Sequence, residues 1–189
     1  MNEAQKVKNS EVERLVEASR KGNRNAFDEL VGLFQQQAMR IAFGILGNAD
    51  EAAEAVQTGF VKTYLSINKL REPNRFEIWL LRIISNTAIS QRKAAKSRVK
   101  AAKAVNCRIQ TTKTFSPEEM TDNKELREAI QQAMLKLSKK EAQAITLFGL
   151  EHLSQKQVAG IMDCSVQAVR WHVFRARKKL KVFLRKYLE

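Results

Sequence analysis

Apolar residues recur at helical spacing through the first half of the chain, at positions i, i+3, i+4 and i+7. Together with a short helix from about Ser10 to Lys21, three such stripes predict a four-helix domain over residues 10–96. The stripes are Phe27, Leu30, Val31, Phe34, Ala38, Ile41, Ala42 and Ile45; then Ala52, Val56, Phe60, Tyr64 and Ile67; then Phe76, Leu80, Ile83 and Thr87.

Helix starts are marked by a Ser or Asn followed three residues later by Glu or Gln, the pattern of a capping box. A second helical segment, beginning with Leu126, Ile130, Ala133 and Leu137, predicts another domain over residues 116–189. Only 7 Gly and 2 Pro interrupt the chain, and few windows alternate as strands do, so we expect an all-α protein of two small helical domains. The capping residues are Ser10, Asn48, Ser116, Ser138 and Ser154, with Ser165 capping the last helix.

The segment between the two domains is basic. No acidic residue occurs from Ile78 to Pro117, and apolar periodicity fades after about Ser97. We therefore expect a basic flexible linker over residues 97–115. It either follows nucleic acid or serves only as a solvated spacer.

The net charge of the chain indicates a class of binding partner. Lys and Arg total 34 against 20 Asp and Glu, a formal net charge of +14. Such an excess favours a polyanion, although it also serves solubility alone. The N-terminus is polar and no long apolar run occurs, so we expect a cytoplasmic protein without membrane insertion. Cys107 and Cys164 are far apart in the sequence, which indicates no disulfide framework.

Residues 154–181 predict a helix-turn-helix. Ser154 caps the segment QKQVAGIM, Asp163 and Cys164 form a short turn, and Ser165 caps the last helix. Ala159 and Gly160 are small where the two helices cross. The alternative is a solvated basic helix that ends a small bundle.

The last helix has an apolar and a cationic face. Gln167 and Arg170 near its start have side chains suited to base edges, and Arg suits guanine. Arg175, Arg177, Lys178 and Lys181 lie farther along and suit phosphates. The inward face consists of Val166, Val169, Val173, Ala176 and Leu180.

The segment LSQKQVAGIMDCSVQAVRWHVFRARKKL resembles the promoter-reading region four of the sigma-70 superfamily. Independently, AFDELVGLFQQQAMRIAFGILGNADEAAEAVQTGFVKTY and RFEIWLLRIISNTAISQRKAAK resemble its region two. No region three intervenes, which resembles the extracytoplasmic-function branch. The resemblance implies an RNA polymerase sigma factor that directs promoter-specific initiation and is not an enzyme.

The resemblance also implies roles for individual residues. The minus-thirty-five reader spans residues 165–178, with Ser165, Gln167, Ala168, Arg170, Trp171, His172, Arg175, Arg177 and Lys178 as DNA-binding candidates. The minus-ten surface comprises Arg82, Asn86, Arg92, Lys93 and a base-holding loop from Lys69 to Arg75. The polymerase-binding candidates are Glu51, Glu54, Gln57 and Phe60. For Trp79, which the resemblance also places on the minus-ten helix, its apolar neighbours favour core packing.

Four positions depart from the family pattern. Ala53 and Thr58 stand where an acid is common, Ser90 where aspartate is frequent, and Gln157 where glutamate is frequent. These departures bear more on the clamp contact than on the DNA contact.

The partners implied are core RNA polymerase, through the clamp of the beta-prime subunit and the flap of beta, promoter DNA and an anti-sigma factor. No cofactor, metal or catalytic residue is expected. An enzyme finds little support, because His152 and His172 lack triad or ligand companions, and a zinc site at His152, Cys164 and His172 lacks an evident fourth ligand. A stand-alone transcriptional regulator and an anti-sigma antagonist are the remaining alternatives.

Overall fold

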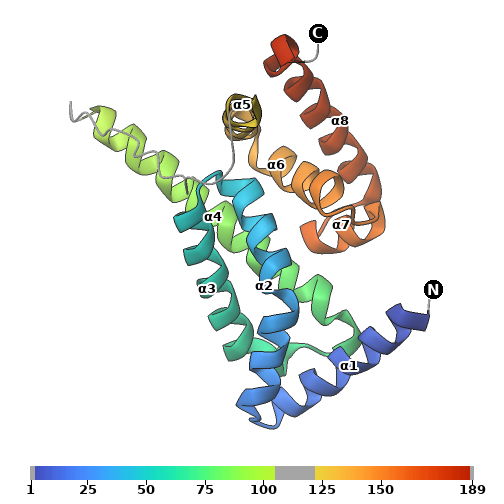
Figure 1. Cartoon of the computed structure of the whole chain (residues 1–189). Helices are drawn as coiled ribbons and strands as arrows, with labels where there is room; N and C mark the ends of the chain where they lie inside the picture. Colours follow the sequence, from blue (N-terminus) through green and yellow to red (C-terminus); the bar gives the residue numbers. More distant parts are fainter. Residues whose placement is uncertain (1–2, 105–121, 188–189) are drawn as a thin grey trace.

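The computed structural model describes residues 3–104 and 122–187, and side chains within residues 10–95, 97–98 and 125–187. The described residues form helices and no strand. Figure 1 shows the eight α-helices, with α1–α4 in one group and α5–α8 beside them. Their bounds are α1 (Glu3–Arg20), α2 (Arg24–Leu46), α3 (Ala49–Ser66), α4 (Phe76–Ala104), α5 (Asp122–Lys136), α6 (Lys139–Ile145), α7 (Gln155–Met162) and α8 (Val166–Phe183).

The N-terminal bundle buries most of the predicted stripes, but Tyr64 stays exposed and Val31, Val56 and Ile83 are only partly buried. Phe34 of α2 and Phe76 of α4 meet with ring centroids 5.6 Å apart, and Leu30 and Ile41 are fully enclosed. Gly59 lets α3 lie close to α4, because a Cβ there would fall 2.4 Å from the end of Ile84. Two short 3₁₀ turns, η1 (Ile67–Lys69) and η2 (Pro73–Arg75), connect α3 to α4.

Helix boundaries in this bundle follow the sequence in part. Gly47 ends α2 with φ 71°, and the side chain of Asn48 accepts from the Glu51 amide, as predicted. Ser10 instead lies inside α1, because the helix-forming residues before it continue the helix. Helix α4 continues beyond the predicted end at residue 96 to Ala104, since the lysines and alanines that follow include no Gly or Pro.

The C-terminal domain contains the predicted helix-turn-helix. Ser138 and Ser154 each form a complete capping box, and a π-helical turn η3 (Thr146–Leu150) extends α6. Asp163 adopts a left-handed conformation with φ 52° in the turn between α7 and α8. The predicted cap at Ser116 lies outside the described residues.

The two helical groups are packed together. Helices α5, α6 and α7 and the turn η3 lie against α2 and α4, on the side of α2 away from α3 (Figure 1). The long contact leaves the α3 side of the bundle uncovered. None of the described helices combines the length and apolar character that crossing a membrane requires.

Candidate nucleic-acid and polymerase interfaces

Helix α8 is fixed by its apolar face and presents its polar face outward. Val169, Val173 and Ala176 are buried against α6 and α7, and Val166 and Leu180 pack at the edge of this core. The side chain of Ser165 caps the helix by accepting from the Ala168 amide at 3.1 Å. The exposed candidates on the opposite face are Gln167, Arg170, Trp171, Arg175, Arg177 and Lys178.

Arg170 is oriented by a residue of α7. Its Nε donates to Oε1 of Gln155 at 2.7 Å. One donor is engaged with the half-buried Gln155 of the neighbouring helix while the Arg170 side chain stays exposed, so the rest of the guanidinium remains available. Gln155 was not among the sequence-predicted residues, because a glutamine at the first turn of a helix carries no distinguishing signal.

Arg175 is held from two sides. Its guanidinium lies 4.7 Å from the centroid of the Trp171 ring, within cation–π range. Its Nε also lies 3.2 Å from a carboxylate oxygen of Glu141 at the start of α6. Lys179, one turn farther along α8, donates to the other Glu141 oxygen at 2.7 Å.

Glu141 therefore links the capping box of α6 to the basic face of α8. Its side chain is almost completely buried and also accepts from the Ser138 amide at 2.9 Å. Burial of the carboxyl opposes its ionisation, but hydrogen bonds from Lys179 and Ser138 outweigh burial and hold its pKa below the ordinary value for glutamate. The sequence identified Glu141 only as a capping residue.

Two further candidates on α8 are less accessible. His172 is half-buried, and burial lowers its pKa, which favours the neutral imidazole. Ala168 is also half-buried near the helix start. Both flank the exposed face rather than forming its centre.

Packing of the two domains leaves some of the predicted minus-ten residues exposed and brings others into contact with the C-terminal domain. Arg75, Asn86 and Lys93 are exposed, and Arg75 pairs with Glu72 at 2.9 Å. Arg82 donates to the carbonyl of Gly160 and lies 3.6 Å from Asp163, both in the C-terminal domain. Arg92 is buried between the domains.

Trp79 is partly buried and packs against the apolar core, with its ring 6.2 Å from that of Phe76. The contact confirms the preference for core packing. Its remaining surface lines a cleft of about 540 Å³ between the start of α4 and α7, with Arg75 at the edge.

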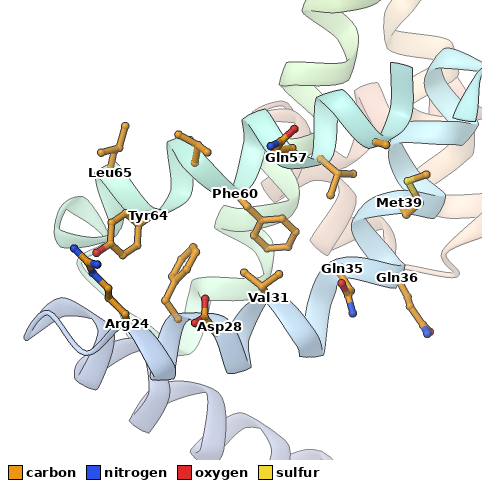
Figure 2. Close-up of a pocket in the computed structure, with 14 residues that line it drawn as sticks. Arg24, Asp28, Val31, Gln35, Gln36, Met39, Gln57, Phe60, Tyr64 and Leu65 are labelled. Carbon is orange, nitrogen blue, oxygen red and sulfur yellow. The ribbon is translucent and has the colours of Figure 1, made fainter. Parts of the chain in front are cut away.

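A larger apolar groove of about 820 Å³ lies between α2 and α3. Figure 2 shows Phe60 of α3 and Val31 of α2 pointing toward each other across it, with Gln57 farther along α3. Two of the four polymerase-binding candidates, Gln57 and Phe60, thus line the groove. Glu51 and Glu54 are exposed on α3 without lining it.

The departure at Ala53 falls inside this groove. Its methyl group stands where the resemblance leads us to expect an acid, and it adds apolar surface at that end of the groove. Val61 and Leu65 continue the lining on α3 and are strongly exposed, 54% and 76%. Apolar exposure of this extent on one face is typical of a protein-binding surface.

A helix-turn-helix with a cationic outer face defines a DNA-binding protein, and here it is joined to a helical domain with an apolar groove. Among the described residues, no group of three or more His, Cys, Asp or Glu side chains is placed to hold a metal ion.

Comparison with known proteins identifies the family to which the chain belongs. The family models for sigma-70 region 2 and sigma-70 region 4 match residues 30–98 and 127–180. The chain is 33% identical over 173 residues to the ECF RNA polymerase sigma-E factor of Escherichia coli, covering 88% of this chain and 90% of that protein. It is 26% identical over 181 residues to the ECF sigma factor SigW of Bacillus subtilis, covering 92% and 97%.

Solved structures share the fold. CnrH, solved with the cytosolic domain of CnrY, matches with a TM-score of 0.68 and 22% identity over 93% of this chain and 98% of that one. The sigma factor RpoE of Bartonella quintana, solved with the anti-sigma factor NepR, matches with a TM-score of 0.66 and 22% identity over 84% and 96%. The chain belongs to the extracytoplasmic-function sigma factors of the sigma-70 family, the promoter-recognising subunits of RNA polymerase.

Proposed function

We propose that the two domains bind separate elements of one promoter. Helix α8 reads the minus-thirty-five element, while α4 and the turn before it bind the melted minus-ten element. The observation that carries this division is the outer face of α8, where Gln167, Arg170 and Lys178 are exposed on a helix anchored by a buried apolar face. The chain supplies specificity and performs no catalytic step itself.

The division of labour within α8 follows from position. Gln167 and Arg170 lie in the first turns, which enter the major groove in helix-turn-helix proteins, and Arg170 is steadied by Gln155. Bidentate contact of an arginine with guanine contributes about 1–3 kcal/mol of discrimination. Arg177 and Lys178 lie farther along and neutralise phosphates.

We propose that the groove between α2 and α3 receives the clamp helices of the polymerase beta-prime subunit. An apolar groove between two helices, lined by Phe60 and Val31 and edged by Gln57, fits a helical partner. The exposed carboxylates of Glu51 and Glu54 beside it favour basic residues on that partner. The groove faces away from the C-terminal domain, so clamp binding and domain packing do not compete directly.

A smaller apolar surface near the end of α8 is the proposed site for the flap of the beta subunit. Phe174, Val182 and Phe183 are exposed there around a hollow of about 420 Å³, bordered by Lys178 and Lys179. An apolar centre with a basic rim fits an amphipathic segment with acidic flanks.

We also propose an anti-sigma partner for the cytoplasmic chain. Two proteins of the same fold were solved with such a partner or with a cytosolic domain bound. The exposed apolar groove between α2 and α3 is the proposed binding site for such an inhibitor, because covering it removes apolar surface from water.

In vitro transcription tests the proposed function. Core polymerase, the purified chain and a library of randomised promoters should yield start sites that follow a two-part element at fixed spacing. A stand-alone regulator would bind duplex DNA without core polymerase and would direct no new start site. That result would overturn the proposal.

A further inference from the structure

Trp171 lies at the centre of the outer face of α8. Successive residues of an α-helix are rotated by about 100°, so Trp171 lies about 160° around the helix from both Val169 and Val173. Those two side chains are buried in the C-terminal domain, whereas Trp171 is 52% exposed. Helix α8 runs along the outside of the molecule, with α6 and α7 on its inner side (Figure 1). The indole therefore points away from the core of the domain.

Exposed cations surround this indole. Arg170 precedes it in the chain, Arg175 lies about one turn farther along α8, and Lys178 lies about two turns farther. Helix α8 itself contains no acidic residue. An apolar ring within a cationic face is complementary to a polyanion that also offers an apolar group. Under the proposed function that polyanion is promoter DNA.

The Trp171 ring is held in place within the chain. The Arg175 guanidinium lies 4.7 Å from the ring centroid, and the His172 ring lies 5.0 Å away in an edge-to-face arrangement. Arg175 is in turn held by Glu141 at 3.2 Å. A tryptophan side chain has only two torsions, so a ring fixed in this way has little freedom to lose when it binds. Such a preorganised apolar surface favours a specific contact.

The major groove of DNA offers one apolar group to such a ring. The base edges there present hydrogen-bond donors and acceptors, and the C5 methyl group of thymine is the single apolar feature. Gln167 and Arg170 carry the polar groups that match the donors and acceptors, whereas Trp171 offers mainly apolar surface. Stacking on the ring face would require a base that has left the duplex, but a helix in the major groove meets base edges.

We propose that Trp171 reads the C5 methyl group of a thymine in the upstream promoter element. This inference rests on the proposed function of α8 and adds a thymine to the guanine for which Arg170 is suited. Arg170 is directed by Gln155, which accepts from its Nε at 2.7 Å, and it is adjacent to Trp171 in the same helical turn. The two side chains therefore contact bases in the same part of the groove.

Deoxyuridine isolates the methyl group, because it pairs with adenine as thymine does and differs from thymine only in lacking that group. Thymines of the upstream element selected in the library experiment are replaced one at a time, on either strand, while the downstream element is unchanged. The holoenzyme of core polymerase and the full chain binds a labelled thymine promoter. Unlabelled thymine or deoxyuridine duplexes then compete, which gives the ratio of their affinities.

At one upstream position, the wild-type holoenzyme should bind the thymine duplex about fourfold more tightly, the factor that corresponds to about 0.8 kcal/mol for one buried carbon group. Trp171→Ala should bind both duplexes with equal affinity, and Trp171→Phe should keep part of the preference. The ratio is the measured quantity, because loss of the Arg175 contact alone would weaken binding of both duplexes to the same extent.

Ile130→Ala is the matched control. Ile130 is also an apolar residue exposed on the C-terminal domain, at 41%, but it lies on α5. Its truncation should keep the wild-type preference for thymine. Trp171→Ala places the best helix-forming residue at an exposed position, so α8 should remain folded.

A selected upstream element without thymine, or equal affinity of the wild-type holoenzyme for thymine and deoxyuridine at every upstream position, would overturn the inference. A preference for thymine that persists in Trp171→Ala would also overturn it, because another residue would then contact the methyl group. In each case, transcription that depends on the upstream element would leave the proposed function standing. If the wild-type holoenzyme selects no upstream element, the proposed function fails and this inference fails with it.

Discussion

Replacing Glu141 with glutamine removes a charge from the junction of α6 and α8 while keeping the cap of α6. The glutamine oxygen can still accept from the Ser138 amide, so the capping box keeps its backbone bond. What is lost is the ionic attraction to Arg175 at 3.2 Å and to Lys179 at 2.7 Å. The substitution therefore isolates the electrostatic link between the cap and the basic face of the reading helix.

The expected loss of stability depends on how far the three charged side chains are buried. The carboxyl is buried, but the side chains of Arg175 and Lys179 are 46% and 35% exposed, so water screens both pairs. Pairs with exposed partners contribute about 0.2–1 kcal/mol each. We expect Glu141→Gln to lower the free energy of unfolding by about 1 kcal/mol at neutral pH. This value lies between the contribution of one weak ion pair and that of two strong ion pairs.

The effect should depend on pH in a defined direction. The folded-state pKa of Glu141 lies below its unfolded value, so ionisation contributes stability above the unfolded pKa. That contribution is lost as pH falls through the folded pKa. In urea denaturation, the free energy of unfolding of the wild-type chain should exceed that of Glu141→Gln at pH 7. This difference should shrink as the pH is lowered and disappear in acid.

Glu29→Gln is the control, because it makes the same charge change at an exposed position of α2. It should leave the denaturation midpoint at pH 7 unchanged. A gap for Glu141→Gln that stays constant from neutral to acidic pH would refute the electrostatic reasoning and leave only a packing effect.

Glu54→Lys reverses a charge beside the groove between α2 and α3, and should weaken co-purification with core polymerase; undiminished recovery would contradict the clamp assignment. Gly59→Ala adds a methyl group 2.4 Å from Ile84 and should destabilise the N-terminal bundle by about 1–3 kcal/mol in denaturant titration, whereas a neutral result would mean that Ile84 moves freely. Lys178→Ala should lower the slope of log affinity against log salt on selected duplex DNA by about 0.9, because one phosphate contact is lost. An unchanged slope would remove Lys178 from the DNA contact.

Local features of the fold were predictable from the sequence. The stripe through Leu30 and Ile41, the break at Gly47 and the capping boxes at Ser138 and Ser154 depend on residues a few positions apart. The outward face of α8 follows from the same spacing, since burying Val169 and Val173 leaves Arg170 exposed. Ser10 shows the limit of this reasoning, because a capping pattern within helix-forming residues does not start a helix.

Contacts between distant segments were not predictable in this way. Arg92 has the same sequence surroundings as the exposed Lys93, yet it is buried because the end of α5 packs over it. Glu141 joins α6 to α8 through side chains that are far apart in the chain, and its partners follow from the crossing of the two helices. The groove between α2 and α3 likewise depends on the distance between helices, which the spacing of Phe60 and Val31 does not give.

The central claim is that each domain reads its own promoter element, and a comparison of selected promoters tests it most directly. Core polymerase with the wild-type chain, or with Arg170→Ala, is used to transcribe one randomised library, and the enriched promoters are sequenced. The account predicts that Arg170→Ala relaxes or changes the preference at one upstream position while the downstream element stays the same. Enrichment of identical upstream elements by both chains, or loss of the downstream element alone, would contradict it.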